Sequence, residues 1–351
     1  MANDFIGQDS QPIQLTDEEQ QIVKEAVARQ QNLLEINSAE ELQRFKQRLS
    51  WRGRRTKILW TAAASLIFII GVGVGVMYSS LNPFSQQEIL VYEANDSVSE
   101  VMLYTGSLTV DLAADSANSV ISSLGALLAE DGIMYDGNAA VEQNLLVVPN
   151  GKTFSVTLSD GTTVFLNSHS RLTYPSAFTG DERRVELSGE AYFKVAKDAA
   201  HPFIVESDGV ETKVLGTEFN VRNFGSEPSN VTLVEGSVLV RMPKHSPVRL
   251  LPGQNIEIQE NGRINVENVD VREYTEWKSG FFYFDNRTLT DVFRIVGRYY
   301  NVSVMCQESK LMGTHFNLWI DMNKSLEDNL DLINEVGDLH SKLVGKTVII
   351  Q

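Results

Sequence analysis

The sequence predicts a single-pass membrane protein with a short helical cytoplasmic segment, an all-β exported domain and a small α+β C-terminal domain. Three observations support this fold class: one long apolar run, basic residues on only one side of it, and strand-like spacing beyond it. The β domain is expected to be a sandwich or a solenoid-like stack. The expected bounds are 1–57 for the cytoplasmic segment, 58–78 for the transmembrane helix, 79–94 for a linker, 95–272 for the β domain and 273–351 for the C-terminal domain.

The apolar run from Ile58 to Tyr78 is long enough to span a bilayer as a helix. It follows more than fifty residues, most of them polar, so it does not resemble a cleavable signal peptide. A buried core helix is the alternative, but such helices rarely run this long without a charge. The basic residues Arg52, Arg54, Arg55 and Lys57 precede the run, and the next basic residue is Lys152. We therefore expect a cytoplasmic N-terminus and an exported C-terminal part.

Composition restricts the function of the exported part. The net charge of the chain is -16, which argues against nucleic acid as a direct ligand. Cys306 is the only cysteine, so no disulfide can form within the chain. Because Cys306 follows an apolar run, we interpret it as a buried small hydrophobe rather than a reactive thiol.

The cytoplasmic segment has two helix-start patterns, Thr16 with Glu19 and Ser38 with Glu41. The second is followed by an apolar stripe that leads to Trp51, and it consists of Leu42, Phe45 and Leu49. Two helices of this size bury little surface alone. Two interpretations stay open: a helix that docks into a partner's groove, and a solvated, partly disordered tail.

From Ile89 onward, short β-rich runs alternate with turn residues. Asp160 and Gly161 stand between two such runs and predict a hairpin. The strands expected in the β domain are 153–158, 162–166, 185–187, 191–195, 203–206, 211–215, 219–222, 231–234, 237–240 and 255–258. After Trp277 the order becomes β-α-β-β-α-β-β, with helices capped by Thr288 with Asp291 and by Ser325 with Asp328.

Several sequence motifs of the predicted exported part resemble those of a known family. The runs VTLSDGTTVFLNSHSRLTYPSAF, RRVELSGEAYFKVAKDAAHPFIVES, ETKVLGTEFNV, VTLVEGSVLV and LLPGQNIEI are similar to FecR-type anti-sigma factors of the Bacteroidetes. The run DVREYTEWKSGFFYFDNRTLTDVFRIVGRYYNVSV is similar to the paired C-terminal domain, which resembles the short domain at the N-termini of secretins and TonB-dependent receptors. The motif positions are Asp160, Gly161, Gly189, Glu190, Tyr192, Phe193, Gly216, Phe219, Gly236, Gly253 and Trp277.

The resemblance implies a single-pass regulator of the inner membrane whose exported domains are periplasmic. It implies three kinds of partner: an extracytoplasmic-function (ECF) sigma factor in the cytoplasm, the N-terminal signalling domain of a TonB-dependent outer-membrane transporter, and site-specific membrane proteases. The expected sigma contacts are Leu42, Phe45, Leu49 and Trp51. The expected transporter contacts lie on the helix after Thr288 and are Leu289, Asp291, Arg294 and Arg298.

The motif residues also have structural interpretations. Gly189 and Gly216 are expected where the backbone bends or approaches a neighbour, and the aromatic motif residues are expected in the core. Arg183, Arg184 and Glu190 predict a partly buried ion pair, with a partner surface as the alternative. His169 is expected to face outward from a strand spanning 164–172.

No catalytic motif joins the five scattered histidines, so the sequence predicts neither an enzyme nor a cofactor or metal site. The alternative to a sigma regulator is a membrane-tethered periplasmic scaffold that binds a glycan or peptidoglycan and has no sigma partner.

Overall fold

The computed structural model describes residues 88–94, 99–129, 132–135, 141–225 and 227–351. The predicted cytoplasmic segment and the predicted span 58–78 lie outside these residues, together with the candidate sigma contacts and the basic cluster. Within the described part of the chain, no helix has the length and apolar character needed to cross a membrane.

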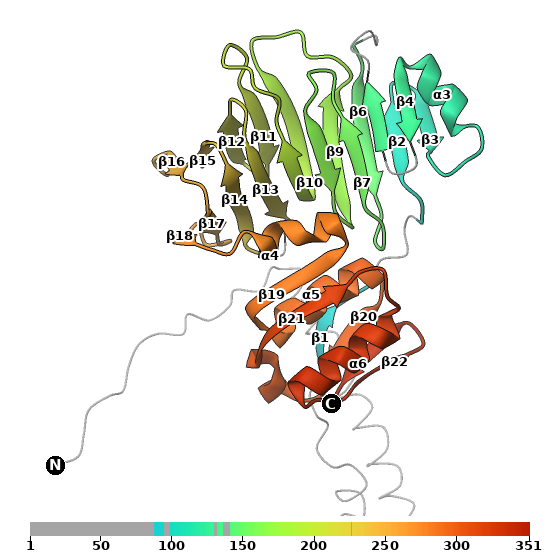
Figure 1. The fold of residues 1–351 in the computed structure, drawn as a ribbon, viewed down its shortest axis with the longest axis vertical. Coiled ribbons are helices and arrows are strands. Elements are labelled where there is room, and N and C mark those ends of the chain that lie inside the picture. Colours follow the sequence, from blue (N-terminus) through green and yellow to red (C-terminus); the bar gives the residue numbers. More distant parts are fainter. Residues whose placement is uncertain (1–87, 95–98, 130–131, 136–140, 226) are drawn as a thin grey trace, which may run out of the picture. The chain divides into compact units, whose positions relative to one another are not determined.

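Most of the described chain forms two β-sheets that share strand β10 (Figure 1). Sheet I has the order β3-β2-β6-β9-β10-β11-β12-β15-β16. Its strands are β2 (Met102–Thr105), β3 (Leu108–Asp111), β6 (Gln143–Val148), β9 (Ser170–Pro175), β10 (Arg183–Lys194), β11 (Phe203–Ser207), β12 (Val210–Val214), β15 (Val238–Arg241) and β16 (Val248–Leu250).

Sheet II has the order β4-β5-β7-β8-β10-β13-β14-β17-β18. Besides β10, its strands are β4 (Ala126–Ala129), β5 (Gly132–Tyr135), β7 (Phe154–Thr157), β8 (Thr163–Leu166), β13 (Glu218–Asn223), β14 (Ser229–Glu235), β17 (Gln254–Ile258) and β18 (Ile264–Asn268). A short helix, α3 (Ala117–Ser123), precedes β4. Apolar side chains of both sheets form one core. The β-rich prediction is confirmed, with two sheets packed around a shared core.

Strand β10 passes from one sheet to the other at Gly189. Its first half pairs with β9 and β11, and its second half pairs with β8 and β13. The backbone of Gly189 has a φ of 111°, and a Cβ added there would lie 2.6 Å from the Cα of Ser170. Only glycine fits this bend. The strands predicted at 185–187 and 191–195 are therefore one continuous strand.

The C-terminal part has the predicted order of elements. It comprises β19 (Phe281–Thr288), α5 (Leu289–Tyr300), β20 (Ser303–Cys306), β21 (His315–Asp321), α6 (Leu326–Gly337), β22 (Ser341–Val344) and β23 (Thr347–Ile350). Thr288 accepts a hydrogen bond from the backbone N–H of Asp291, and Ser325 caps α6 in the same way. Helix α4 (Arg272–Thr275) and the 3-10 helix η1 (Glu276–Ser279) connect it to sheet II, and a second 3-10 helix, η2 (Ser309–Gly313), precedes β21.

One strand of the C-terminal sheet comes from the other end of the described chain. Strand β1 (Ile89–Tyr92) pairs antiparallel with β20, and the sheet order is β1-β20-β23-β22. In Figure 1 it is the cyan strand among orange and red elements. It lies within the segment predicted as a linker, and strand pairing over more than two hundred residues carries no local sequence signal.

The structure tests the predictions for His169 and Cys306. His169 is not in a strand: it lies in the turn between β8 and β9 with a φ of 60°, and its ring stacks on that of Phe224. The prediction of an outward-facing strand residue is wrong because the chain reverses at 167–169. Cys306 is fully buried, as predicted, and burial raises the pKa of its thiol.

Candidate functional site

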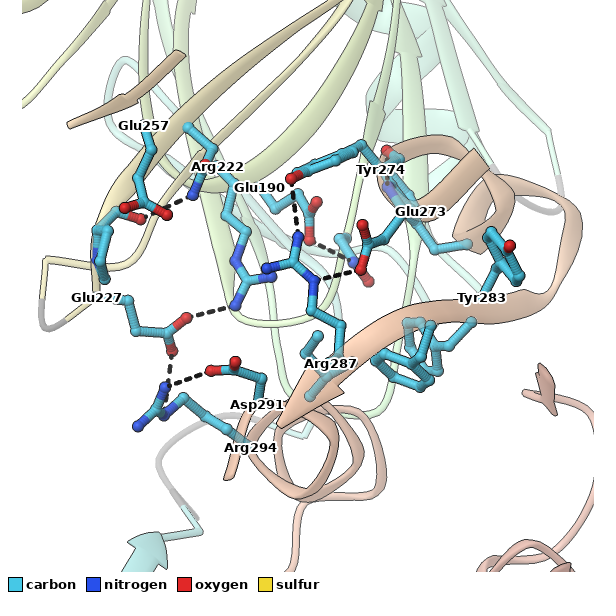
Figure 2. Close-up of a pocket in the computed structure, with 17 residues that line it drawn as sticks. Glu190, Arg222, Glu227, Glu257, Glu273, Tyr274, Tyr283, Arg287, Asp291 and Arg294 are labelled. Carbon is cyan, nitrogen blue, oxygen red and sulfur yellow. Dashed lines mark hydrogen bonds and ion pairs between the residues drawn. The ribbon is translucent and has the colours of Figure 1, made fainter. Parts of the chain in front are cut away.

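The candidate site is a pocket of about 220 Å3 between the outer face of sheet II and the C-terminal elements, which we call the joint pocket (Figure 2). Its lining combines charged and aromatic side chains. The residues are Asn167, Glu190, Arg222, Glu227, Pro228, Asn230, Glu257, Glu273, Tyr274, Trp277, Phe282, Tyr283, Phe284, Arg287, Asp291, Arg294 and Ile295.

One row of directly opposed residues crosses four strands of sheet II and contributes to the pocket lining. Glu190 on β10 faces Arg222 on β13, which faces Asn230 on β14, which in turn faces Glu257 on β17. These positions alternate with apolar core residues such as Ala191 and Val221, so strand geometry places their side chains on the outer face. The row is polar and is the sheet's contribution to the pocket.

Glu227, in the loop between β13 and β14, is the centre of the charged network. Its side chain is 5% exposed. It accepts a hydrogen bond from Arg222 at 2.5 Å and another from Arg298 on α5, and Arg294 lies 3.9 Å away. Burial disfavours the ionised carboxylate, but the positive charges of Arg222 and Arg298 outweigh it and hold the pKa of Glu227 below its ordinary value. Glu227 therefore links sheet II to α5 through charge.

Arg298 adds aromatic contacts to this link. Its guanidinium lies 3.6 Å from the ring centroid of Phe224 and 5.8 Å from that of Tyr92 on β1. The side chain is buried, so the cation is held between a carboxylate and two ring faces and is shielded from solvent. Arg298 thus contacts the β13–β14 loop and β1 at once.

A second charged group lies across the pocket, and Figure 2 shows it on α4 and β19. Arg287 donates hydrogen bonds to Glu273 and, at 2.8 Å, to the hydroxyl of Tyr274. Burial raises the pKa of Glu273 despite the attraction of Arg287. Glu190 is paired differently, because it accepts hydrogen bonds from the amides of Asn167 and Asn220 at 2.9 and 3.0 Å.

Beside the pocket, an apolar contact joins β10 to η1 and β19. Tyr192 belongs to the cluster of buried side chains that includes Trp277 and Phe282. The ammonium of Lys278 lies 3.3 Å from the centroid of the Tyr192 ring. The Tyr192 hydroxyl donates to Glu218 at 2.5 Å, and burial is the largest cause of its raised pKa.

Most of the motif residues predicted from the sequence have structural roles, in turns, in the core or at close approaches of the backbone. Asp160 and Gly161 form the β7–β8 turn, and Phe193 stacks on Phe219 in the core with ring centroids 5.1 Å apart. Added Cβ atoms at Gly216 and Gly236 would come within 2.6 and 2.8 Å of neighbours. Gly253 is a turn residue with a φ of 85°, and Tyr192 and Trp277 pack outside sheet II.

The charged residues predicted to form one ion pair have separate partners. Arg183 is buried and donates to Asp160 at 2.6 Å, whereas Arg184 is exposed and contacts Glu182, Glu206 and Glu211. Glu190 pairs with neither arginine, because the two ends of β10 lie in different sheets.

The four candidate transporter contacts differ in exposure. Leu289 is fully buried in the C-terminal core, and Arg298 is buried against Glu227, so neither side chain faces solvent in this conformation. Asp291 and Arg294 line the joint pocket and pair with each other at 3.4 Å. A role of these residues in transporter binding stays a prediction.

Sequence reasoning missed Glu227, Arg222, Glu273 and Arg287. They come from separate loops and strands, and none of them is among the motif positions that the sequence singled out. One sequence signal was present: Ala191, Tyr192 and Phe193 are apolar at successive positions, which is typical of a strand covered on both faces, and β10 is indeed buried from Gly189 to Phe193. Among the described residues, no group of three or more potential ligand side chains is placed to hold a metal ion.

Comparison of the chain with family models and solved structures provides the family assignment. The model described as FecR protein matches residues 144–239, and the model described as FecR, C-terminal matches residues 281–350. Two crystal structures, at 1.65 and 2.50 Å resolution, show a candidate anti-sigma factor from Parabacteroides distasonis ATCC 8503. Each is 33% identical to this chain with a TM-score of 0.55, and the match covers 59% of this chain and 98% of that one.

This chain belongs to the FecR family. The FecR model spans β6 into β15, and the C-terminal model spans β19 to β23. The joint pocket of this FecR protein is lined by residues from both matched regions and from the segment between them. No curated protein matches the chain.

Proposed function

We propose that this FecR protein is a transmembrane anti-sigma factor. It holds an ECF sigma factor inactive at its cytoplasmic N-terminal segment and is located in the inner membrane with periplasmic C-terminal domains. A signal from the N-terminal domain of a TonB-dependent outer-membrane transporter ends this inhibition. Site-specific membrane proteases then complete the release of the sigma factor.

The observation that carries this proposal is the similarity to a candidate anti-sigma factor over 98% of the crystallised chain of that protein. Support for the topology comes from the apolar run 58–78 and the basic residues before it. Support for a relay comes from the joint pocket, because its ion pairs connect two regions that each match a FecR model. Charge pairs of this kind are sensitive to displacement, since a buried carboxylate without its partner is costly.

A transcription reporter tests the proposal in cells that contain the full chain and its sigma factor. Replacing Phe45→Ala and Leu49→Ala should release transcription without a signal, because apolar anchors dominate helix-in-groove interfaces. Gln47→Ala is the matched control, since helical spacing places it opposite the stripe. Unchanged repression at normal protein level in the stripe variant would contradict the proposed sigma contact.

A second candidate function is recognition of a glycan or peptidoglycan by the C-terminal part. The rings of Phe281, Tyr283 and Trp319 form a cluster on β19 and β21, and Trp319 is 43% exposed. Exposed aromatic clusters often mark interaction sites. Titration with peptidoglycan fragments, with Trp319→Ala as the control, would test this candidate. Saturable binding in a chain that captures no sigma factor would favour it.

A further inference from the structure

Strand β1 is an edge strand with a single partner. It is terminal in its sheet and pairs only with β20 among the described strands. It spans four residues, and a bulge interrupts the register between Leu90 and Tyr92. Short, bulged edge strands make few ladder hydrogen bonds. The β1–β20 ladder aligns only three residue pairs, against six between β10 and β13.

Side-chain contacts of β1 come from two regions of the protein. Val91 is buried in the C-terminal core, whereas Leu90 is 55% exposed. The Tyr92 hydroxyl accepts a hydrogen bond from Asn150, in the turn between β6 and β7, at 3.0 Å. The Tyr92 ring packs on Gly297 of α5, where an added Cβ would lie 2.7 Å from it. Asn150 also donates to Asn301 at the end of α5. Through these contacts, β1 touches both α5 and the β6–β7 turn, so its position depends on how α5 lies against the FecR sheets.

Strand β1 is also close in sequence to the predicted membrane span. Only residues 79–88 separate it from the apolar run 58–78. Any change in the pairing of β1 therefore acts on the segment next to the predicted span.

We propose that the β20 edge is a strand-binding site and that its resident occupant, residues 88–94 of the same chain, is exchangeable. The ligand is an extended strand of a protein partner that runs antiparallel to β20, with an apolar residue in the place of Val91 and an aromatic ring in the place of Tyr92. Its entry frees β1 and the segment before it. This mechanism rests on the proposed function, because it specifies how a periplasmic partner would act on the membrane-proximal segment.

A labelled peptide of residues 88–94 tests the exchange directly with the full chain in detergent. The locked variant carries Leu90→Cys and Met305→Cys, which are directly opposed in the ladder, in a Cys306→Ala background. The matched control carries Val344→Cys and Thr347→Cys in the same background, which links β22 to β23 and leaves β1 free.

Saturable peptide binding is expected in the unmodified chain, in the oxidised control and in the reduced locked variant. Oxidation of the locked variant should weaken binding by about tenfold or more, because apparent affinity follows the fraction of open sites. Tyr92→Ala should strengthen binding for the same reason. Absence of binding to every variant, or equal binding to the oxidised locked variant, would overturn the proposal.

The sigma reporter separates this inference from the proposed function. If the peptide exchanges and the oxidised lock prevents induction, both are supported. If the peptide exchanges but no variant affects sigma-dependent transcription, the strand-binding site holds and the anti-sigma assignment fails. If repression depends on Phe45 while the peptide never exchanges, the anti-sigma assignment holds and the strand-binding site fails.

Discussion

The carboxylate of Glu227 accepts a hydrogen bond from the guanidinium of Arg298, and these two residues stand 71 positions apart on different layers of the protein. Glu227 follows β13 of sheet II, whereas Arg298 lies near the end of α5. Arg222 and Arg294 share the same carboxylate. One buried anion therefore holds three cations, and through them it couples the FecR sheets to the C-terminal helix.

Replacing Glu227→Gln should destabilise the chain by about 3 kcal/mol, because it leaves buried arginines without their anion. Urea unfolding of the full chain in detergent would measure the change. Glu267→Gln on the exposed edge strand β18 is the control, and its effect should stay within about 0.5 kcal/mol. Similar values for the two variants would argue against a central role of Glu227.

The contribution of Glu227 should also depend on pH. Its pKa in the folded chain lies below its ordinary value, so its stabilisation is complete above about pH 4.5 and is lost as the pH falls through the folded pKa. The difference in unfolding free energy between the native chain and Glu227→Gln should therefore shrink in acid. Glu273 has the opposite sign, because its pKa is raised, so only the difference measurement isolates Glu227. A difference that grows in acid would contradict this assignment.

Gly297→Ala should loosen the contact between α5 and β1. The new methyl group would meet the Tyr92 ring at 2.7 Å and Val304 at 3.0 Å, and overpacking of this kind costs about 1–3 kcal/mol. Hydrogen exchange of the β1 amides would detect the loss of protection. Gly313→Ala, which meets nothing within 4 Å, is the control and should leave that protection unchanged.

Gly189→Ala should be among the most damaging glycine substitutions in the FecR sheets. It combines a φ of 111° with backbone atoms of Ser170 at 2.6 Å and His169 at 2.8 Å, so both strain and overlap oppose it. We expect a loss of more than about 2 kcal/mol or failure to fold. Gly161→Ala also has a positive φ but an open surrounding, and it should cost only about 1 kcal/mol. Thermal unfolding of both variants would compare them.

The neighbours Arg183 and Arg184 should differ in their effect on stability. Arg183→Ala removes a buried cation that contacts Asp160 and the backbone of Ala196 and His201, and it should cost about 3 kcal/mol. Arg184→Ala removes exposed ion pairs and should cost less than about 1 kcal/mol, with a dependence on salt. Equal losses, measured by urea unfolding at low and high salt, would contradict this reading of β10.

Local sequence patterns predicted much of the fold. Capping pairs such as Thr288 with Asp291 located both C-terminal helices, and the Asp160–Gly161 turn located its hairpin. These patterns involve residues only a few positions apart, so they can be recognised without knowledge of the tertiary structure. The same holds for Gly189, whose need for a bend was expected, although the continuity of β10 through two sheets was not.

The candidate site was much less predictable. Glu190, Arg222, Asn230 and Glu257 form one row only because four strand registers align them. The pairing of β1 with β20 likewise joins segments that are more than two hundred residues apart. Long-range register of this kind is set by packing of the complete core, and no single segment encodes it.

Capture of a sigma factor by the purified full chain is the most direct test of the anti-sigma assignment. The ECF sigma factor and the chain would be produced together, and the amount that co-purifies would be compared among the native chain, the Phe45→Ala and Leu49→Ala variant, and the Gln47→Ala control. We predict specific capture by the native chain and the control, and its loss in the stripe variant. No capture by the native chain, with the sigma factor present and folded, would contradict the assignment.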